Sequence, residues 1–270
     1  VYPNMGFDET HFIDDFDQTK ILRDYITDQE LYEKIVDRYE SKKSNEDLFI
    51  MSISMQNHGG YTEKYDNFDE KARMLGINYP DVNQYLSLIH ESDSALEYLI
   101  SYFEKVDDPV EIVFFGDHQP SLSSSFYPYL NGKGLGGLTL SELENLYTVP
   151  FFIWTNYDSD KESVELTSLN YLSTLALERA GIALPAYNQF LADMMEEIPA
   201  VNSRGFYSKS QRKFLHVEDA AGEDAKWLKN YEILQYNNMF DKRNKSGLFF
   251  PYLKKKKIFF FFFMVQILFS

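Results

Sequence analysis

The strongest candidate for chemistry is an acid followed at once by a histidine, at the end of an apolar run. Residues 110–115 are β-prone and almost entirely apolar, and they stop at Gly116, after which Asp117 and His118 follow. Such a run is typical of a buried strand that opens onto a loop. In open α/β sheets, ligands collect at these strand ends. Gly116 and Pro120 bracket a turn that would let both side chains face one ion.

The pair Asp117 and His118 offers a carboxylate oxygen and an imidazole nitrogen. These donors suit zinc, manganese or iron better than calcium. The alternative is a strand-to-turn transition with a capping Asp117 and an exposed His118. These two residues alone leave both interpretations open.

A second apolar run, residues 48–55, leads into Gln56-Asn57-His58-Gly59-Gly60-Tyr61. Two strands that each deliver a histidine at their end favour one shared site. His58 beside two glycines is also a common turn residue. Gly59 and Gly60 would let the backbone approach a bound anion closely.

Helical and strand patterns alternate along the chain, which is typical of βαβ units in a mainly parallel sheet. Helical spacing follows an N-cap at Thr27 or Asp28. A buried stripe from Tyr85 to Phe103, which includes Ser92, predicts core packing for a second helix. Strands are predicted at 48–55, 110–115 and 148–155. Helices are predicted from about 28 to 40, from Asp81 or Asn83 to about Glu104, and at 140–146, 167–180, 189–197 and 222–240.

Three further features receive no catalytic role. The glycine-rich stretch 132–137 lacks the ending of a phosphate loop and does not open a helix directly, so we expect an irregular excursion beside the site. His90 and Asp93 lie on a predicted helix, where a solvated or capping role is expected. His216 has no partner nearby in sequence.

Composition excludes several classes of protein. The 270 residues suffice for one large α/β domain or two small ones. The net charge of −16 argues against nucleic acid as a partner. The absence of cysteine excludes disulfides, zinc–thiolate sites, iron–sulfur clusters and a thiol nucleophile. The chain opens with neither Met nor a signal peptide, so we expect it to be a piece of a longer protein.

The segment 251–270 is anomalous, because four lysines precede a run of phenylalanines. Its apolar part is too short to cross a bilayer core of about 30 Å as a helix, and it would be an aggregation hazard in water. We expect read-through or frameshifted sequence beyond a true end near Phe250. The alternative is a short anchor at the membrane interface.

The motifs Met55–Tyr61 and Phe115–Ser121, in this order, resemble the lipoteichoic-acid-synthase-like sulfatase family of the alkaline phosphatase superfamily. The opening Tyr2–Asp8 and the late Gln235–Asp241 resemble it too, so the likeness covers nearly all of residues 1–250. The resemblance implies an α/β fold, alkaline-phosphatase/sulfatase-like, with a mostly parallel sheet and helices on both faces, truncated at the N-terminus.

The family consists of metal-dependent enzymes on the extracellular face of the bacterial cell membrane. They move phosphoglycerol from phosphatidylglycerol to a glycolipid or a growing polymer. By resemblance, Asp117 and His118 would be ligands of a divalent metal, manganese in the synthases. His58 would contact the phosphoryl or glycerol head group of the substrate.

The family's threonine nucleophile, a further acidic metal ligand, a Trp/Arg substrate pair and the membrane helices lie upstream of the segment that matches this chain. Ser52, Ser54 and Thr62 lie near the predicted site, but no pattern marks them as nucleophiles. We therefore expect the C-terminal part of a catalytic domain, inactive alone. A sulfatase, phosphodiesterase or phosphoethanolamine transferase of the same fold, or a non-catalytic module that binds a wall polymer, remain alternatives.

Overall fold

The chain forms two compact units in a computed structural model that describes residues 2–240 and 259–265. Unit 1 comprises Val1–Leu138, Leu146–Tyr157 and Ile258–Ser270, and unit 2 comprises Thr139–Asn145 and Asp158–Lys257. Each unit has its own apolar core. The domain boundary that the sequence predicts near residue 250 lies outside the described residues.

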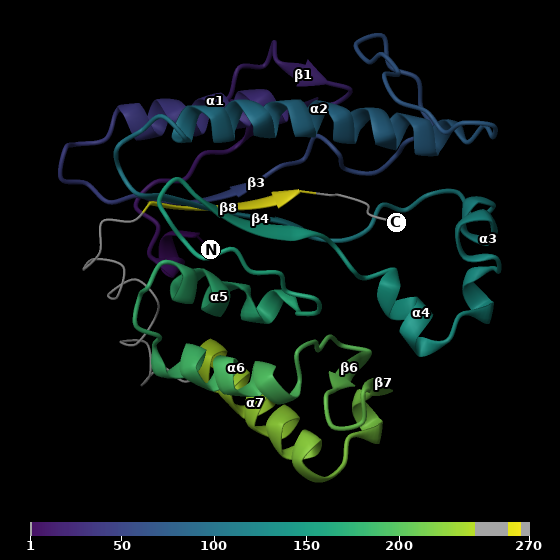
Figure 1. The fold of residues 1–270 in the computed structure, drawn as a ribbon. Helices are drawn as coiled ribbons and strands as arrows, with labels where there is room; N and C mark the ends of the chain where they lie inside the picture. The colour runs from purple at the N-terminus through teal and green to yellow at the C-terminus, as the bar shows by residue number, and fades with distance from the viewer. Residues whose placement is uncertain (1, 241–258, 266–270) are drawn as a thin grey trace. The chain divides into compact units, whose positions relative to one another are not determined.

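Unit 1 contains the main sheet and the two helices that pack on it (Figure 1). A hairpin of two short strands precedes the first of these helices, and no helix or strand forms in residues 62–79. The elements are η1 (Tyr2–Met5), η2 (Ile13–Asp15), β1 (Ile21–Leu22), β2 (Tyr25–Ile26), α1 (Asp28–Glu40), β3 (Phe49–Ile53), α2 (Pro80–Phe103), β4 (Val110–Gly116), α3 (Phe126–Asn131), η3 (Leu135–Gly137), β5 (Phe151–Thr155) and β8 (Phe259–Val265).

The main sheet has the strand order β3-β8-β4-β5. Strands β3, β8 and β4 run parallel, and β5 pairs antiparallel with β4. The register places Ile53 of β3 and Phe115 of β4 opposite the same residue, Met264 of β8. The predicted α/β class with a mostly parallel sheet is confirmed.

Helices α1 and α2 pack on one face of this sheet (Figure 1). Alternate residues of a strand point to the same face, and every second residue of β4 from Val110 to Phe114 joins the core that α1 and α2 form with the sheet. The predicted start of α1 is correct, because the side chain of Thr27 accepts a hydrogen bond from the Glu30 backbone N–H. The core includes Tyr32, Ile35, Val36, Tyr39, Ala95, Leu99, Phe103, Val110, Ile112 and Phe114.

Strand β8 is the one strand of the main sheet that the sequence pattern does not predict. It belongs to the segment 251–270, for which we expect read-through or frameshifted sequence, and it fills the position between β3 and β4. A run of aromatic residues has high β propensity, and each neighbouring strand offers backbone groups that need partners. The origin of this segment, read-through or frameshift, stays a prediction, and residues 251–258 and 266–270 lie outside the described part.

Unit 2 contains helices and a small hairpin, and its helices lie within a few residues of the predicted ones. The helix predicted at 167–180 begins with a 3₁₀ turn, a common form of helix end. The exposed His216 ends the second strand of the hairpin. The elements are α4 (Leu140–Asn145), η4 (Leu169–Tyr171), α5 (Leu172–Arg179), α6 (Ala186–Glu197), β6 (Gly205–Ser208), β7 (Lys213–His216), η5 (Val217–Asp219) and α7 (Gly222–Phe240).

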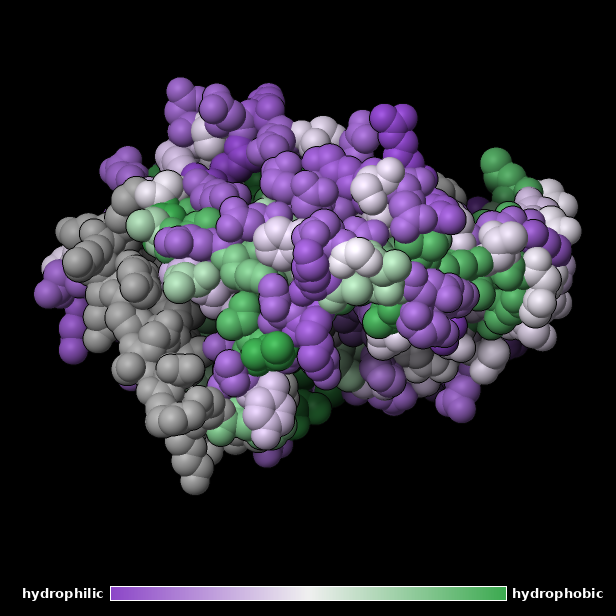
Figure 2. Space-filling model, turned by 90° about the horizontal axis from the view of Figure 1, so that it is seen from below, coloured by the Kyte–Doolittle hydropathy of each residue, from purple (hydrophilic) through white to green (hydrophobic). Residues whose placement is uncertain are grey.

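On the face shown in Figure 2, polar side chains cover most of the area, and apolar ones form smaller areas between them. Within the described residues, every helix is too short or too polar to cross a bilayer.

Removal of residues 258–270 tests the place of β8 in the sheet. We expect the shortened chain to lose cooperative unfolding of unit 1, because β3 and β4 would both lose their ladder of backbone hydrogen bonds to β8. Urea unfolding followed by circular dichroism measures this change. A chain that lacks only residues 266–270 is the matched control, and an unchanged urea midpoint after removal of 258–270 would contradict the assignment.

Candidate functional site

The loops that follow β3 and β4 leave the same edge of the sheet. Ile53 and Phe115 lie level on either side of Met264. Neighbouring strands lie about 4.8 Å apart. Because β8 lies between β3 and β4, the two loops leave the sheet about 10 Å from each other. The loop after β3 carries His58, and the loop after β4 carries Asp117 and His118. This arrangement agrees with the expectation of one shared edge, while the chemical roles of these residues stay predictions.

An electrostatic interaction also links the two loops. Tyr61 ends the glycine-rich loop that carries His58, and it is only 3% exposed. Burial raises the pKa of Tyr61 above its usual value, the charge of Arg23 opposes the shift, and the negative charge of Asp117 adds to it. The Asp117 carboxylate is therefore close enough to the loop of His58 to raise the pKa of Tyr61.

Asp117 and His118 form a compact pair of exposed side chains. Asp117 Oδ1 accepts a hydrogen bond of 2.8 Å from the His118 backbone N–H. His118 Nδ1 lies 2.9 Å from the carbonyl oxygen of Gln119. A carbonyl oxygen can only accept, so Nδ1 carries the proton, and in the neutral ring the lone pair is on Nε2. This Nε2 lies 3.5 Å from Asp117 Oδ2.

This geometry fits two ligands of one divalent cation. The Nε2 lone pair of His118 and the Oδ2 of Asp117 are neighbouring donors, and the Gln119 carbonyl holds the imidazole in the tautomer that binds metal. A nitrogen and a carboxylate oxygen suit a borderline cation such as manganese, iron or zinc. Across residues 2–240 and 259–265, no group of three His, Asp or Glu side chains could hold a metal. The pair is therefore part of a metal site at most.

His58 is exposed at the tip of the other loop. Its backbone N–H donates to the Met55 carbonyl at 3.0 Å, which closes a turn directly after β3. Its Nδ1 lies 3.2 Å from the hydroxyl of Tyr25, and the two rings are 5.7 Å apart. The Tyr25 contact orients the imidazole.

A buried polar network connects the loop of His58 to helices α1 and α2. Ser92 Oγ donates to Asp28 Oδ2 at 2.5 Å and accepts from the side-chain amides of Gln56 at 3.1 Å and Asn57 at 2.8 Å. Ser54 donates to the other oxygen of Asp28, and Gln56 Oε1 accepts from the Asp28 backbone N–H at 3.0 Å. Burial raises the pKa of Asp28, and the two serine hydrogen bonds oppose that shift.

The sequence pattern does not predict this network. Helical spacing predicts core packing for Ser92, whereas Ser92 joins α1, α2 and the loop through hydrogen bonds. The one available signal is a polar residue at a buried helical position. Ser54 is bound to Asp28 and Ser52 is buried, so neither hydroxyl is placed as a nucleophile. His90 and Asp93 are exposed, as predicted.

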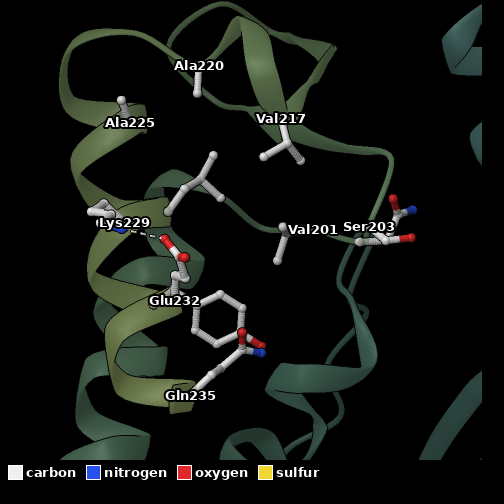
Figure 3. A pocket seen from close by; sticks show the side chains of 11 residues that line it. Val201, Ser203, Val217, Ala220, Ala225, Lys229, Glu232 and Gln235 are labelled. Atoms are coloured by element: carbon white, nitrogen blue, oxygen red, sulfur yellow. Dashed lines mark hydrogen bonds and ion pairs between the residues drawn. The ribbon is translucent and has the colours of Figure 1, made fainter. Parts of the chain in front are cut away.

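A pocket of about 660 Å³ lies in unit 2, between α7 and residues 201–203 (Figure 3). Its lining is mostly apolar, with an ion pair of 2.7 Å between Lys229 and Glu232 at one side. His58, Asp117 and His118 all belong to unit 1. The pocket therefore contains none of the residues that the sequence identifies as candidates.

A family model described as Sulfatase matches residues 1–182, which is more than half of the chain. The chain belongs to the sulfatase family. The matched region contains His58, Asp117 and His118, and it confirms the family that the motifs around these residues predict. This sulfatase-family chain is thus a member of an enzyme superfamily.

Two curated relatives come from Rhizobium meliloti (strain 1021). A protein named for cyclic beta-1,2-glucan modification is 21% identical over 267 residues, which are 93% of this chain and 40% of that protein. The capsular polysaccharide biosynthesis protein RkpI is 35% identical over 129 residues, 47% of this chain and 22% of that protein. The sulfatase-family chain thus spans less than half the length of either relative.

A solved structure shares the fold. The Streptococcus pyogenes phosphoglycerol transferase GacH, in complex with sn-glycerol-1-phosphate, matches with a TM-score of 0.61 and 20% identity. The match covers 87% of the sulfatase-family chain and 56% of the GacH chain. At this identity, the likeness establishes the fold.

Replacement of Ser92 by Ala tests the network beneath the loop. It would leave Asp28, Gln56 and Asn57 without a shared partner, and each unsatisfied buried group costs about 1–3 kcal/mol. We expect the free energy of unfolding to fall by about 3 kcal/mol in urea titrations. Ser94→Ala on the same helix is the control, since Ser94 is exposed and its loss should cost less than about 0.5 kcal/mol. Equal effects of the two variants would contradict the network.

Proposed function

We propose that this chain is the C-terminal part of the catalytic domain of a metal-dependent phosphoglycerol transferase. In this proposal Asp117 and His118 bind a divalent metal, manganese being the expected one, and His58 contacts the phosphoglycerol group. The observation that carries the proposal is the exit of both loops from one sheet edge, about 10 Å apart, with the His118 Nε2 lone pair beside Asp117 Oδ2.

The proposed reaction has two transfers at phosphorus. A hydroxyl nucleophile, supplied by the longer protein, forms a bond to the phosphorus of phosphatidylglycerol, and diacylglycerol leaves with a proton. An acceptor hydroxyl then attacks the same phosphorus and restores the nucleophile. The metal neutralises charge on the phosphoryl oxygens when bound. Phosphoryl transfer depends mainly on positioning and charge stabilisation, which His58 supplies by donating to a phosphoryl oxygen or to the leaving alkoxide.

A glycan or glycolipid is the acceptor that we propose. Both curated relatives carry names that concern polysaccharides, and GacH is a phosphoglycerol transferase solved with sn-glycerol-1-phosphate. We also propose, from the family resemblance, that the enzyme acts at the extracellular face of a bacterial cell membrane and is attached by parts of the longer protein. The net charge of −16 agrees with a partner other than nucleic acid.

The two proposed metal ligands are tested in the complete protein by Asp117→Ala and His118→Ala. We expect each variant to lose bound manganese and to transfer phosphoglycerol more than about a hundredfold more slowly, because charge stabilisation of several kcal/mol is lost. Metal analysis and release of diacylglycerol from phosphatidylglycerol vesicles measure the two effects.

His90→Ala, an exposed histidine on α2, is the matched control for these variants. Unchanged manganese content in Asp117→Ala would contradict the ligand assignment. If the complete protein hydrolyses a sulfate ester and does not turn over phosphatidylglycerol, it is a sulfatase and the proposed transferase activity is wrong.

His58→Ala separates substrate contact from metal binding. We expect turnover to fall by about 10²–10⁴-fold, the usual contribution of a general acid or base, while manganese content stays at the level of the parent protein. Metal analysis and steady-state kinetics on one preparation measure both. Loss of metal together with activity would show that His58 acts on the metal or on the fold instead.

A further inference from the structure

Arg23 occupies an unusual place beside the loop of His58. It lies in the turn between β1 and β2, and its backbone φ is +56°. Residues other than glycine rarely adopt this backbone conformation, and it persists where surrounding contacts enforce it. Arg23 is also only 4% exposed. Arginine is seldom buried to this extent without specific partners.

The contacts of the guanidinium explain its burial. Arg23 Nη2 donates to the backbone carbonyls of Gln56 at 3.0 Å and His58 at 2.7 Å. Its Nη1 donates to the carbonyl of Gly60 at 3.2 Å and to Gln84 Oε1 on α2, also at 3.2 Å. Three alternate carbonyls of the loop therefore converge on one rigid, planar cation.

Three tyrosine rings surround the same guanidinium. Its carbon lies 5.8 Å from the ring centre of Tyr25, 5.5 Å from that of Tyr61 and 5.8 Å from that of Tyr65. These are cation–π distances. Tyr25 is also the residue whose hydroxyl lies beside His58 Nδ1. The β1–β2 hairpin thus holds both the backbone and the ring of His58.

The charge of Arg23 is balanced by dipoles and π faces. Among the described residues, no carboxylate lies within ion-pair distance of it. Burial lowers the pKa of Arg23, but a guanidinium in a protein stays protonated. A buried cation beneath the loop raises the electrostatic potential at the loop and favours an anion there.

We propose that Arg23 is the positioning residue for His58. Arg23 holds the loop 56–60 in the one conformation that presents the imidazole of His58 to a phosphoglycerol group. This inference rests on the proposed function for the identity of the ligand alone. The position of the loop follows from the hydrogen bonds of Arg23, whatever the ligand is.

The test compares Arg23→Met and Arg23→Lys in the full chain. Amide hydrogen exchange at His58, whose N–H donates to Met55, reports the loop, and titration with sn-glycerol-1-phosphate reports binding. In Arg23→Met we expect at least tenfold faster exchange at His58, unchanged exchange in β4, and at least tenfold weaker binding. Lysine keeps the charge but cannot span three carbonyls, so we expect an intermediate result for both readouts.

Arg212→Met is the matched control, because Arg212 is exposed and also has a positive φ, +54°, in the turn between β6 and β7. It should change neither readout. Unchanged His58 exchange and unchanged binding in Arg23→Met would overturn the proposal. So would exchange that rises equally throughout unit 1 in Arg23→Lys, since that result indicates a role in stability alone.

If the parent chain shows no affinity for sn-glycerol-1-phosphate, the proposed function fails as it applies to this ligand. The exchange of the His58 amide still decides the role of Arg23. Faster local exchange would then support Arg23 as the residue that positions the loop, and unchanged exchange would overturn it.

Discussion

The shared register of β3 and β4 is the constraint on which the candidate site depends. Ile53 and Phe115 align with the same residue of β8, so the two strands end at one level of the sheet. A shift of one residue would turn every side chain of a strand to the opposite face. With the register kept, the acid–histidine pair and the second histidine emerge about two strand spacings, roughly 10 Å, apart.

Strand pairing positions the loops, and buried polar contacts shape them. Asp28 and Ser92 anchor the loop of His58 from the helices, while Arg23 binds its backbone carbonyls from the side. Polar groups at such depth are stable only when they are satisfied, which makes their arrangement specific. Asp117 and His118 are instead exposed and are held by short contacts within their own turn, an arrangement open to an ion from solvent.

Much of this architecture could be predicted from local patterns. The apolar run before Gly116 and the cap at Thr27 correctly predict β4 and the start of α1. The role of Arg23 could not be predicted from local patterns. Its hydrogen-bond partners lie 33 to 61 residues away in the chain, and the residues next to it in sequence carry no periodic signal. β8 was missed for a related reason, since its pairing with β3 and β4 depends on contacts more than a hundred residues distant along the chain.

The most direct test of the shared site is the line broadening that Mn²⁺ causes in the imidazole NMR signals of this chain. The chain has five histidines, of which His90 and His216 serve as internal controls. We expect Mn²⁺ to broaden the signals of His118 and His58 first, and we expect Asp117→Ala to remove this selectivity. Broadening of His118 without His58, or equal broadening of all five signals, would contradict a single site at this edge of the sheet.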